Sequence, residues 1–252
     1  MSFTFYGDLI GISSLYRLSA EIAHERLNKF YNIAFRTLDP RWEEENDVKE
    51  WMISDSVLIS GRNPEAALSQ LVSVYTELLR EGLMLRGAIV AGELRFEPRV
   101  TRANFQKSLP QDDTLARAVG LERTQKGARL LIENTLAQTL LEHEPDWLTQ
   151  DGYVRNIRGH NSTPFDSVLR RITPTPDGST YELLYFWPDR LTDYQQKRNE
   201  LNEIKKMVGE NIAEHYKETV DLLARSKSRY QFTRKQLNAE PYAGMLDELH
   251  HG

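Results

Sequence analysis

The chain has no cysteine among its 252 residues. Disulfide bonds, thiolate metal sites and cysteine nucleophiles are therefore excluded, and the composition is compatible with a reducing compartment. No stretch approaches the roughly 20 apolar residues that a membrane helix needs, and the N-terminus has no basic segment followed by a long apolar run. We therefore expect a soluble, cytoplasmic protein.

An excess of positive charge is also absent. The 32 Lys and Arg residues are outnumbered by 37 Asp and Glu residues, which gives a net charge of −5. Because no global positive field would attract nucleic acid, a nucleic-acid-binding protein becomes a minority interpretation. The 40% of hydrophobic residues can supply the core of one large domain, or of a medium domain with an appendage.

Two aspartates stand beside short apolar stretches, and they are the main candidates for chemistry. Asp8 closes an apolar stretch at residues 3–8 that predicts a buried strand, and Asp55 lies inside a predicted hairpin at residues 46–60. If these strands are neighbours, the two carboxylates converge. Convergent carboxylates bind divalent cations, and the glycine-containing turn beside them suits a polyphosphate. Each aspartate alone could be an ordinary cap or turn residue.

The first half of the chain predicts an alternation of strands and helices. Residues 13–38 should be helical, with two helices meeting near His24 or a change of the buried face there. A further helix should run from Pro64 to about Arg80, with Gly82 as its C′ residue, followed by a central strand in residues 83–94. The predicted order is strand, helices, two strands, helix and strand.

The second half of the chain is less regular. Residues 98–113 and 149–176 predict irregular structure, residues 120–141 predict a helix, and residues 181–187 predict a late strand. From about residue 191 to residue 237, charged and apolar residues mix at helical spacing. This pattern predicts a long helix or a pair of helices.

Four motifs, in this order, resemble those of class III nucleotide cyclases. The stretch at residues 8–13, Asp-Leu-Ile-Gly-Ile-Ser, is similar to the first metal motif of that family, and Ile-Ser-Asp-Ser at residues 53–56 resembles the second. Residues 85–92 look like the family's strand with a basic residue and two spaced glycines. Gln125 to Arg129 looks like a degraded version of the helical motif in which Asn and, four residues later, Arg stabilise the transition state. The resemblance spans about residues 3–133.

The resemblance implies an α+β fold with a ferredoxin-like, mostly antiparallel sheet and helices packed on it. It implies a nucleotide cyclase catalytic domain at residues 1–190, with residues 191–252 as a C-terminal helical extension packed on or beside it. In the family, two copies pair head to tail, so a homodimer with active sites at its interface is expected here.

The resemblance also implies a lyase mechanism that uses two divalent cations, Mn²⁺ or Mg²⁺. Asp8, Asp55 and the backbone carbonyl of Leu9 would hold the cations, which lower the pKa of the ribose 3′-OH of a nucleoside triphosphate. The 3′-oxygen would attack the α-phosphorus and expel pyrophosphate. Phosphate oxygens would be bound by the backbone amides at the start of the following helix, those of Gly11, Ile12 and Ser13.

The remaining site residues are assigned by the same resemblance. Arg129, in the motif that begins at Gln125, would meet the charge on the α-phosphate from the partner chain, and Arg86 could bind phosphate. Arg129 could equally be a solvent-facing helical arginine, and Arg86 could simply flank a strand end.

Trp51 bears on the base of the substrate. Purine cyclases place a lysine four residues before the second Asp, and this chain has Trp51 there. In this it resembles the pyrimidine cyclases of Pycsar anti-phage systems. The indole could form a wall for a smaller base, or it could be a core residue.

The resemblance therefore implies a uridylate or cytidylate cyclase that makes cyclic UMP or cyclic CMP as a second messenger in antiviral defence. UTP is slightly preferred because it is frequent in the similar proteins, and a separate effector protein would sense the product. The alternatives are a purine cyclase that uses other base readers, and a non-catalytic, cyclase-like, nucleotide-binding dimer.

Overall fold

A seven-stranded sheet organises the chain in the computed structural model, which describes residues 1–38, 44–97, 109–142, 167–187 and 191–237. The strand order is β2-β3-β1-β4-β5-β7-β6, and of these neighbouring pairs β4 and β5 alone are parallel. The predicted α+β class with a mostly antiparallel sheet is confirmed. The strands are β1 Ser2–Leu9, β2 Lys49–Ile53, β3 Ser56–Arg62, β4 Leu85–Ala91, β5 Leu130–Ile132, β6 Ile172–Pro174 and β7 Tyr181–Leu183.

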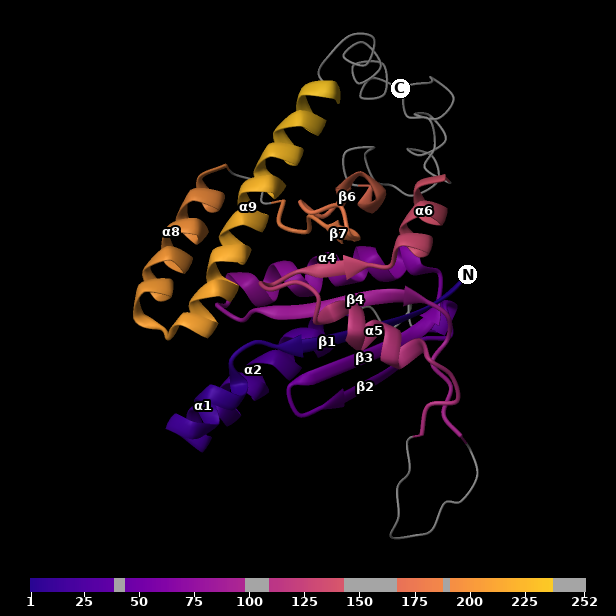
Figure 1. Ribbon diagram of the computed structural model, residues 1–252, viewed down its shortest axis with the longest axis horizontal. Coiled ribbons are helices and arrows are strands. Elements are labelled where there is room, and N and C mark those ends of the chain that lie inside the picture. The colour runs from indigo at the N-terminus through magenta and orange to yellow at the C-terminus, as the bar shows by residue number, and fades with distance from the viewer. Residues whose placement is uncertain (39–43, 98–108, 143–166, 188–190, 238–252) are drawn as a thin grey trace.

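The helices of the described ranges lie around this sheet (Figure 1). They are α1 Ile12–Leu18, α2 Ala20–Thr37, α4 Pro64–Arg80, α5 Thr114–Glu122, α6 Asn134–Glu142, α8 Leu191–Met207 and α9 Glu210–Leu237, with a short 3₁₀ helix η2 at Val168–Arg171. From β1 to β4 the chain follows the order β-α-α-β-β-α-β, with the strands arranged β2-β3-β1-β4. This is the split β-α-β arrangement of ferredoxin-like folds.

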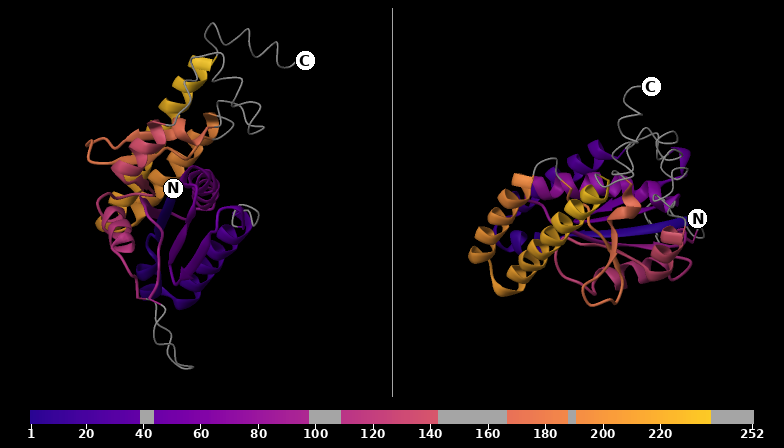
Figure 2. Two further views of the ribbon diagram at one scale, coloured as in Figure 1. Left: turned by 90° about the vertical axis from the view of Figure 1, so that its right-hand side faces the viewer. Right: turned by 90° about the horizontal axis from the view of Figure 1, so that it is seen from above.

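The two faces of the sheet have different covers. A side chain at Gly87 would meet the Tyr75 hydroxyl of α4 at 2.6 Å, so this face of β4 packs closely against α4. Arg86, which immediately precedes Gly87, donates a hydrogen bond to Glu122 of α5. Because successive side chains of a strand point to opposite faces, α4 and α5 cover opposite sides. Figure 2 shows α2 and α4 on one side of the strands and α5 on the other.

Local signals in the sequence explain where the helices begin. The Ser19 hydroxyl accepts a hydrogen bond from the Ile22 amide at 3.3 Å and so caps α2. The Asn63 side chain accepts one from the Ala66 amide at 3.2 Å, and Pro64 occupies the first turn of α4. The predicted helix from Pro64 to Arg80 is confirmed, and Gly82 has the left-handed φ of 74° that suits a C′ residue.

Several predicted boundaries are wrong. The break in the first helical segment falls at Ser19, where a hydroxyl cap starts a new helix, and not near His24. Residues 120–141 are not one helix, because α5 ends at Glu122 and β5 intervenes before α6. The strand predicted at residues 181–187 ends at Leu183, and η2 and β6 lie in the segment expected to be irregular. Most of that segment, and residues 98–108, lie outside the described residues.

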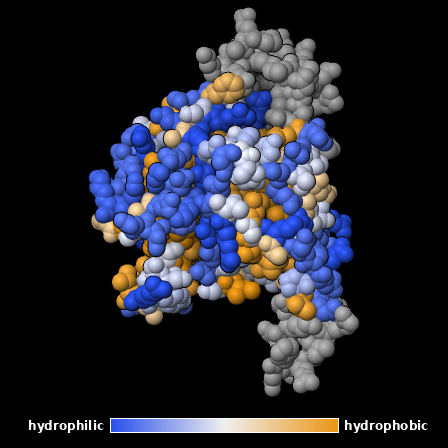
Figure 3. Space-filling view, in the orientation of Figure 1, coloured by the Kyte–Doolittle hydropathy of each residue, from blue (hydrophilic) through white to orange (hydrophobic). Residues whose placement is uncertain are grey.

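The C-terminal helices α8 and α9 run side by side (Figures 1 and 2), so of the two predicted alternatives, one long helix or a pair, the structure has the pair. α9 is joined to the loop before β5: the Thr219 hydroxyl accepts a hydrogen bond from the Ala128 amide at 2.9 Å, and His215 Nδ1 accepts one from the Gly127 amide at 3.1 Å. The surface over α8 and α9 is mostly hydrophilic (Figure 3). No helix within the described ranges is long and apolar enough to span a membrane.

Candidate functional site

A two-residue turn between β2 and β3 presents Asp55. Ile53 pairs with Ser56, which leaves Ser54 and Asp55 as the loop. Ser54 has a φ of 56°, a conformation that is uncommon for a residue with a side chain but that suits a tight hairpin. The Tyr31 hydroxyl, which comes from α2, donates a hydrogen bond to the Ser54 carbonyl at 3.0 Å. The helix therefore holds the turn in place.

The strand register brings Asp8 to the same end of the sheet. Asp8 pairs with Ser56 of β3 on one side and with Arg86 of β4 on the other. The amide of Leu9 donates to the Asp55 carbonyl at 2.8 Å, so the backbone of β1 is tied to the turn. The predicted convergence of Asp8 and Asp55 is what this register produces.

The charge of Asp8 is only partly compensated in the folded chain. Burial, and then the negative charge of Asp55, raise the pKa of Asp8. The Ser56 hydroxyl donates to Asp8 Oδ1 at 3.2 Å, and Arg86 Nη2 lies 3.9 Å from Asp8 Oδ2, and both lower that pKa. Because the raising causes dominate, the site favours an added cation.

A buried carboxylate on α5 completes the arrangement. Glu122 is 1% exposed, and its Oε1 accepts a hydrogen bond from Arg86 Nε. Burial is the largest cause of a raised pKa for Glu122, and the negative charge of Asp8 contributes in the same direction. Arg86 is therefore shared between Glu122 and Asp8, with the exposed Arg123 as a second nearby cation.

Three polar residues of this site were not predicted from the sequence. Tyr6 and Ser56 share the face of Asp8, and their hydroxyls lie 3.2 Å apart. Glu122 was not predicted as a site residue because the sequence placed it in a helix at residues 120–141 that the structure does not contain. The signal that could have identified Tyr6 and Ser56 is the strand period of two, since Tyr6 precedes Asp8 by two residues.

Trp51 lies on the same face of the sheet as Asp8. It pairs with Leu58 of β3, which in turn pairs with Tyr6. Counting two strands across and two residues along gives a Cα separation from Asp8 of about 12 Å. The indole is partly buried and meets the Phe96 ring edge-on at 5.3 Å between centroids. Trp51 is therefore neither fully buried core nor free of neighbours.

The structure does not bring Gln125 and Arg129 to the aspartates, and the helical motif predicted for them is wrong. Gln125 lies between α5 and β5, where its side-chain amide donates to Asp177 Oδ2 at 2.8 Å. Arg129 is 2% exposed, and its guanidinium donates to the Lys126 carbonyl at 2.9 Å, to Glu182 at 2.9 Å and to Glu218 at 2.6 Å. A guanidinium enclosed in this way has no donor aimed at a partner's phosphate.

The donor set fits a divalent cation that shares its ligands with a substrate. Across the described ranges, no group of three or more His, Cys, Asp and Glu residues could hold a metal ion. Two carboxylates at the end of a sheet are a partial site, and Mg²⁺ in particular is bound by one or two carboxylates together with phosphate oxygens. Asp8 and Asp55 match that requirement.

Two large apolar residues near this end of the sheet are exposed. Leu18 at the end of α1 is 80% exposed, and Ile53 beside the turn is 62% exposed. Figure 3 shows hydrophobic residues on the surface where α1 lies. Exposed apolar residues of this size are found on surfaces that another molecule covers.

No protein-family model matches the sequence, and no curated protein sequence does. Solved structures with a similar fold include the adenylyl cyclase CyaB from P. aeruginosa, with a TM-score of 0.45 and 16% identity over 56% of this chain and 81% of that one. The dimeric guanylyl cyclase domain of the RhoGC fusion protein from the aquatic fungus Blastocladiella emersonii has a TM-score of 0.42 and 15% identity, over 56% and 83%. At these scores the likeness carries no argument about the function of this chain.

Proposed function

We propose that the chain is a divalent-metal-dependent nucleotide cyclase that converts a pyrimidine ribonucleoside triphosphate, UTP or CTP, to its 3′,5′-cyclic monophosphate and pyrophosphate. The observation that carries this proposal is the pairing of Asp8 with Ser56 and Arg86 beside the Asp55 turn. It places two carboxylates, whose charges repel, at one partly open end of the sheet.

Asp8, Asp55 and the carbonyl of Leu9 would hold the cations, either Mn²⁺ or Mg²⁺. Bound cations lower the pKa of a ribose hydroxyl and neutralise a triphosphate, which is the chemistry that cyclisation requires. Arg86 would bind the triphosphate from β4, and Glu122 would hold its guanidinium in position. Gly11 precedes α1, and Ile12 and Ser13 are the first residues of that helix, so their backbone amides would bind phosphate oxygens.

Trp51 supports a pyrimidine rather than a purine. Its distance of about 12 Å from Asp8 leaves room for the ribose and base of a nucleotide between the metal site and the indole. A large aromatic wall at that place favours the smaller base. The role in anti-phage defence and a product-sensing effector protein rest on the sequence resemblance alone, and the cytoplasmic location rests on the composition of the sequence.

A homodimer would complete the site. Arg86 and Arg123 are the arginines that compensate Asp8, and Arg86 is shared between Asp8 and Glu122. A triphosphate needs further donors, and a second copy that covers Leu18 and Ile53 would bring them. The burial of the Arg129 guanidinium supports a partner residue other than Arg129 at the α-phosphate.

The test is incubation of the purified protein with Mn²⁺ and each of the four ribonucleoside triphosphates, followed by separation of the products. We expect a cyclic monophosphate from UTP or CTP. Asp8→Ala and Asp55→Ala should abolish it while the dimer persists in light scattering. Cyclic product from ATP or GTP alone would favour the purine cyclase, and nucleotide binding without turnover would favour a non-catalytic dimer.

A further inference from the structure

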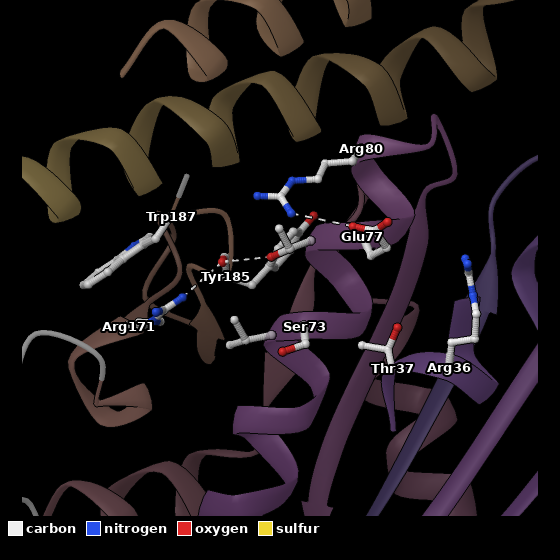
Figure 4. Close-up of a pocket in the computed structure, with 10 residues that line it drawn as sticks. Arg36, Thr37, Ser73, Glu77, Arg80, Arg171, Tyr185 and Trp187 are labelled. Atoms are coloured by element: carbon white, nitrogen blue, oxygen red, sulfur yellow. Dashed lines mark hydrogen bonds and ion pairs between the residues drawn. The ribbon is translucent and has the colours of Figure 1, made fainter. Parts of the chain in front are cut away.

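A cavity of about 500 Å³, separate from the Asp8 and Asp55 site, lies between the helices α2 and α4 and the segment from Arg171 to Trp187 (Figure 4). Small-molecule sites typically occupy roughly 300–1,000 Å³ and combine apolar walls with a few placed polar groups. The apolar walls here are Val72, Tyr185 and Trp187. None of the cavity's residues belongs to the Asp8 and Asp55 site.

Three arginines from three separate elements line this cavity: Arg36 from α2, Arg80 from α4 and Arg171 from η2. Among the described residues that line the cavity, the one carboxylate is that of Glu77, whose Oε2 lies 3.6 Å from Arg80 Nη1. Both side chains of that pair are well exposed, so it contributes little free energy. The cavity is therefore a positive region on a protein whose net charge is −5.

The aromatic end of the cavity is rigid before any ligand arrives. The guanidinium of Arg171 lies over the Trp187 ring, 4.4 Å from its centroid, and Nη1 donates to the Tyr185 carbonyl at 3.3 Å. Thr76 donates to the same carbonyl at 3.3 Å, and the buried Tyr185 hydroxyl donates to the Ala128 carbonyl at 2.7 Å. Preorganised groups of this kind lower the entropy cost of binding.

We propose that this cavity, which we name the arginine pocket after Arg36, Arg80 and Arg171, binds a small organic phosphate. The planar guanidinium fork matches phosphate oxygens in geometry and charge. Trp187 and Val72 supply a surface for the apolar part of the ligand. Figure 4 shows Arg171 and Trp187 on one side, Arg36 on the opposite side, and Arg80 with Glu77 between them.

The simpler explanation is that the arginines stabilise helix ends. Arg36 and Arg80 stand in the last turns of α2 and α4, where a cation interacts favourably with the helix dipole. That explanation extends to the end of η2, where Arg171 is the last residue, but the Arg171 guanidinium lies over the Trp187 ring and donates to the Tyr185 carbonyl, which are outside that helix. It also predicts no saturable binding of anions, so a binding experiment distinguishes it from the proposed phosphate site.

The experiment is calorimetric titration of the full chain with phenyl phosphate in EDTA, which keeps metal out of the Asp8 and Asp55 site. We expect one saturable site, with inorganic phosphate binding more weakly because it lacks an apolar part. Arg36→Gln and Arg80→Gln should each weaken binding about tenfold, the effect of losing one charge-assisted contact. Glu77→Gln should tighten it, because a competing carboxylate disappears.

Two controls make the outcome decisive. Arg62 is an exposed arginine outside the pocket, with a carboxylate partner at 3.8 Å, so Arg62→Gln removes the same charge and should leave the affinity unchanged. Asp8→Ala should also leave it unchanged, since the pocket is separate from the metal site. Absence of saturable binding, an equal loss in Arg62→Gln, or loss of binding in Asp8→Ala would each overturn the proposal.

Discussion

Replacement of Arg129 by Met tests whether this buried arginine is structural. The guanidinium of Arg129 is enclosed with Glu182, which is fully buried, and with Glu218, whose side chain is 26% exposed. Arg225 also pairs with Glu182. Arg129→Met removes one cation from this network, and Glu182→Gln removes the carboxylate that both arginines share.

The two replacements should differ in size. Breaking a buried ion pair by removing one partner costs about 3–5 kcal/mol, because an uncompensated charge stays buried. After Arg129→Met, Glu182 keeps Arg225 and Glu218 keeps access to water, so we expect a loss near the lower end of this range. After Glu182→Gln, two neighbouring guanidinium groups face a neutral amide, and the loss should be larger.

Urea unfolding followed by circular dichroism measures these losses. Lys126→Met is the matched control, because Lys126 pairs with Glu214 at the surface, where both side chains are about half exposed. That variant should lose under about 1 kcal/mol. If Arg129→Met keeps the wild-type free energy of unfolding and instead loses cyclase activity, the interpretation that Arg129 stabilises the fold is wrong.

Three further predictions concern the site itself. Glu122→Gln leaves Arg86 with Asp8 as its remaining carboxylate, so the dissociation constant for Mn²⁺ should rise about tenfold. The control Glu133→Gln removes the carboxylate that pairs with Arg117 and should leave this constant unchanged. Equal dissociation constants for Glu122→Gln and the wild type in calorimetry would contradict the prediction. Because the pKa of Asp8 is raised in the folded state, the contribution of Asp8 to stability is present at low pH and is lost as pH rises from 3.8 through the raised pKa. In EDTA, Asp8→Asn should therefore raise the melting temperature at pH 7 and not at pH 3. A lower melting temperature of the variant at pH 7 would refute the direction of this pKa shift. Trp51→Ala should narrow the ratio of kcat/KM between UTP and ATP, while Trp51→Phe keeps most of it, and an unchanged ratio would make Trp51 a packing residue.

The fold from β1 to β4 could be predicted because each element carries a local signal. The helix α4 has a proline in its first turn and a left-handed glycine at its end, so its bounds followed from Pro64 and Gly82. The hairpin was predictable because its apolar stretches flank a polar turn of two residues. From these elements the meeting of Asp8 and Asp55 followed by topology.

The segment after β4 could not be predicted in the same way. β5 has three residues, all fully buried, and a continuous apolar run of that length fits a strand and a helix equally well. The decision depends on partners far away in the chain: Gly87 of β4 donates to the Arg129 carbonyl at 2.9 Å, and the Arg129 side chain is fixed by Glu182 and Glu218. No local sequence pattern predicts those long-range contacts.

The central claim is that Asp8 and Asp55 together support metal-dependent cyclisation of a nucleoside triphosphate. The most direct measurement follows 3′,5′-cyclic nucleotide formed from UTP or CTP by the wild-type protein in EDTA and after Mn²⁺ is added, with Asp8→Asn and Asp55→Asn in parallel. The account predicts product with Mn²⁺ in the wild type, none in EDTA, and none in either folded variant. Product formation that survives EDTA, or that survives the loss of either aspartate, would contradict it.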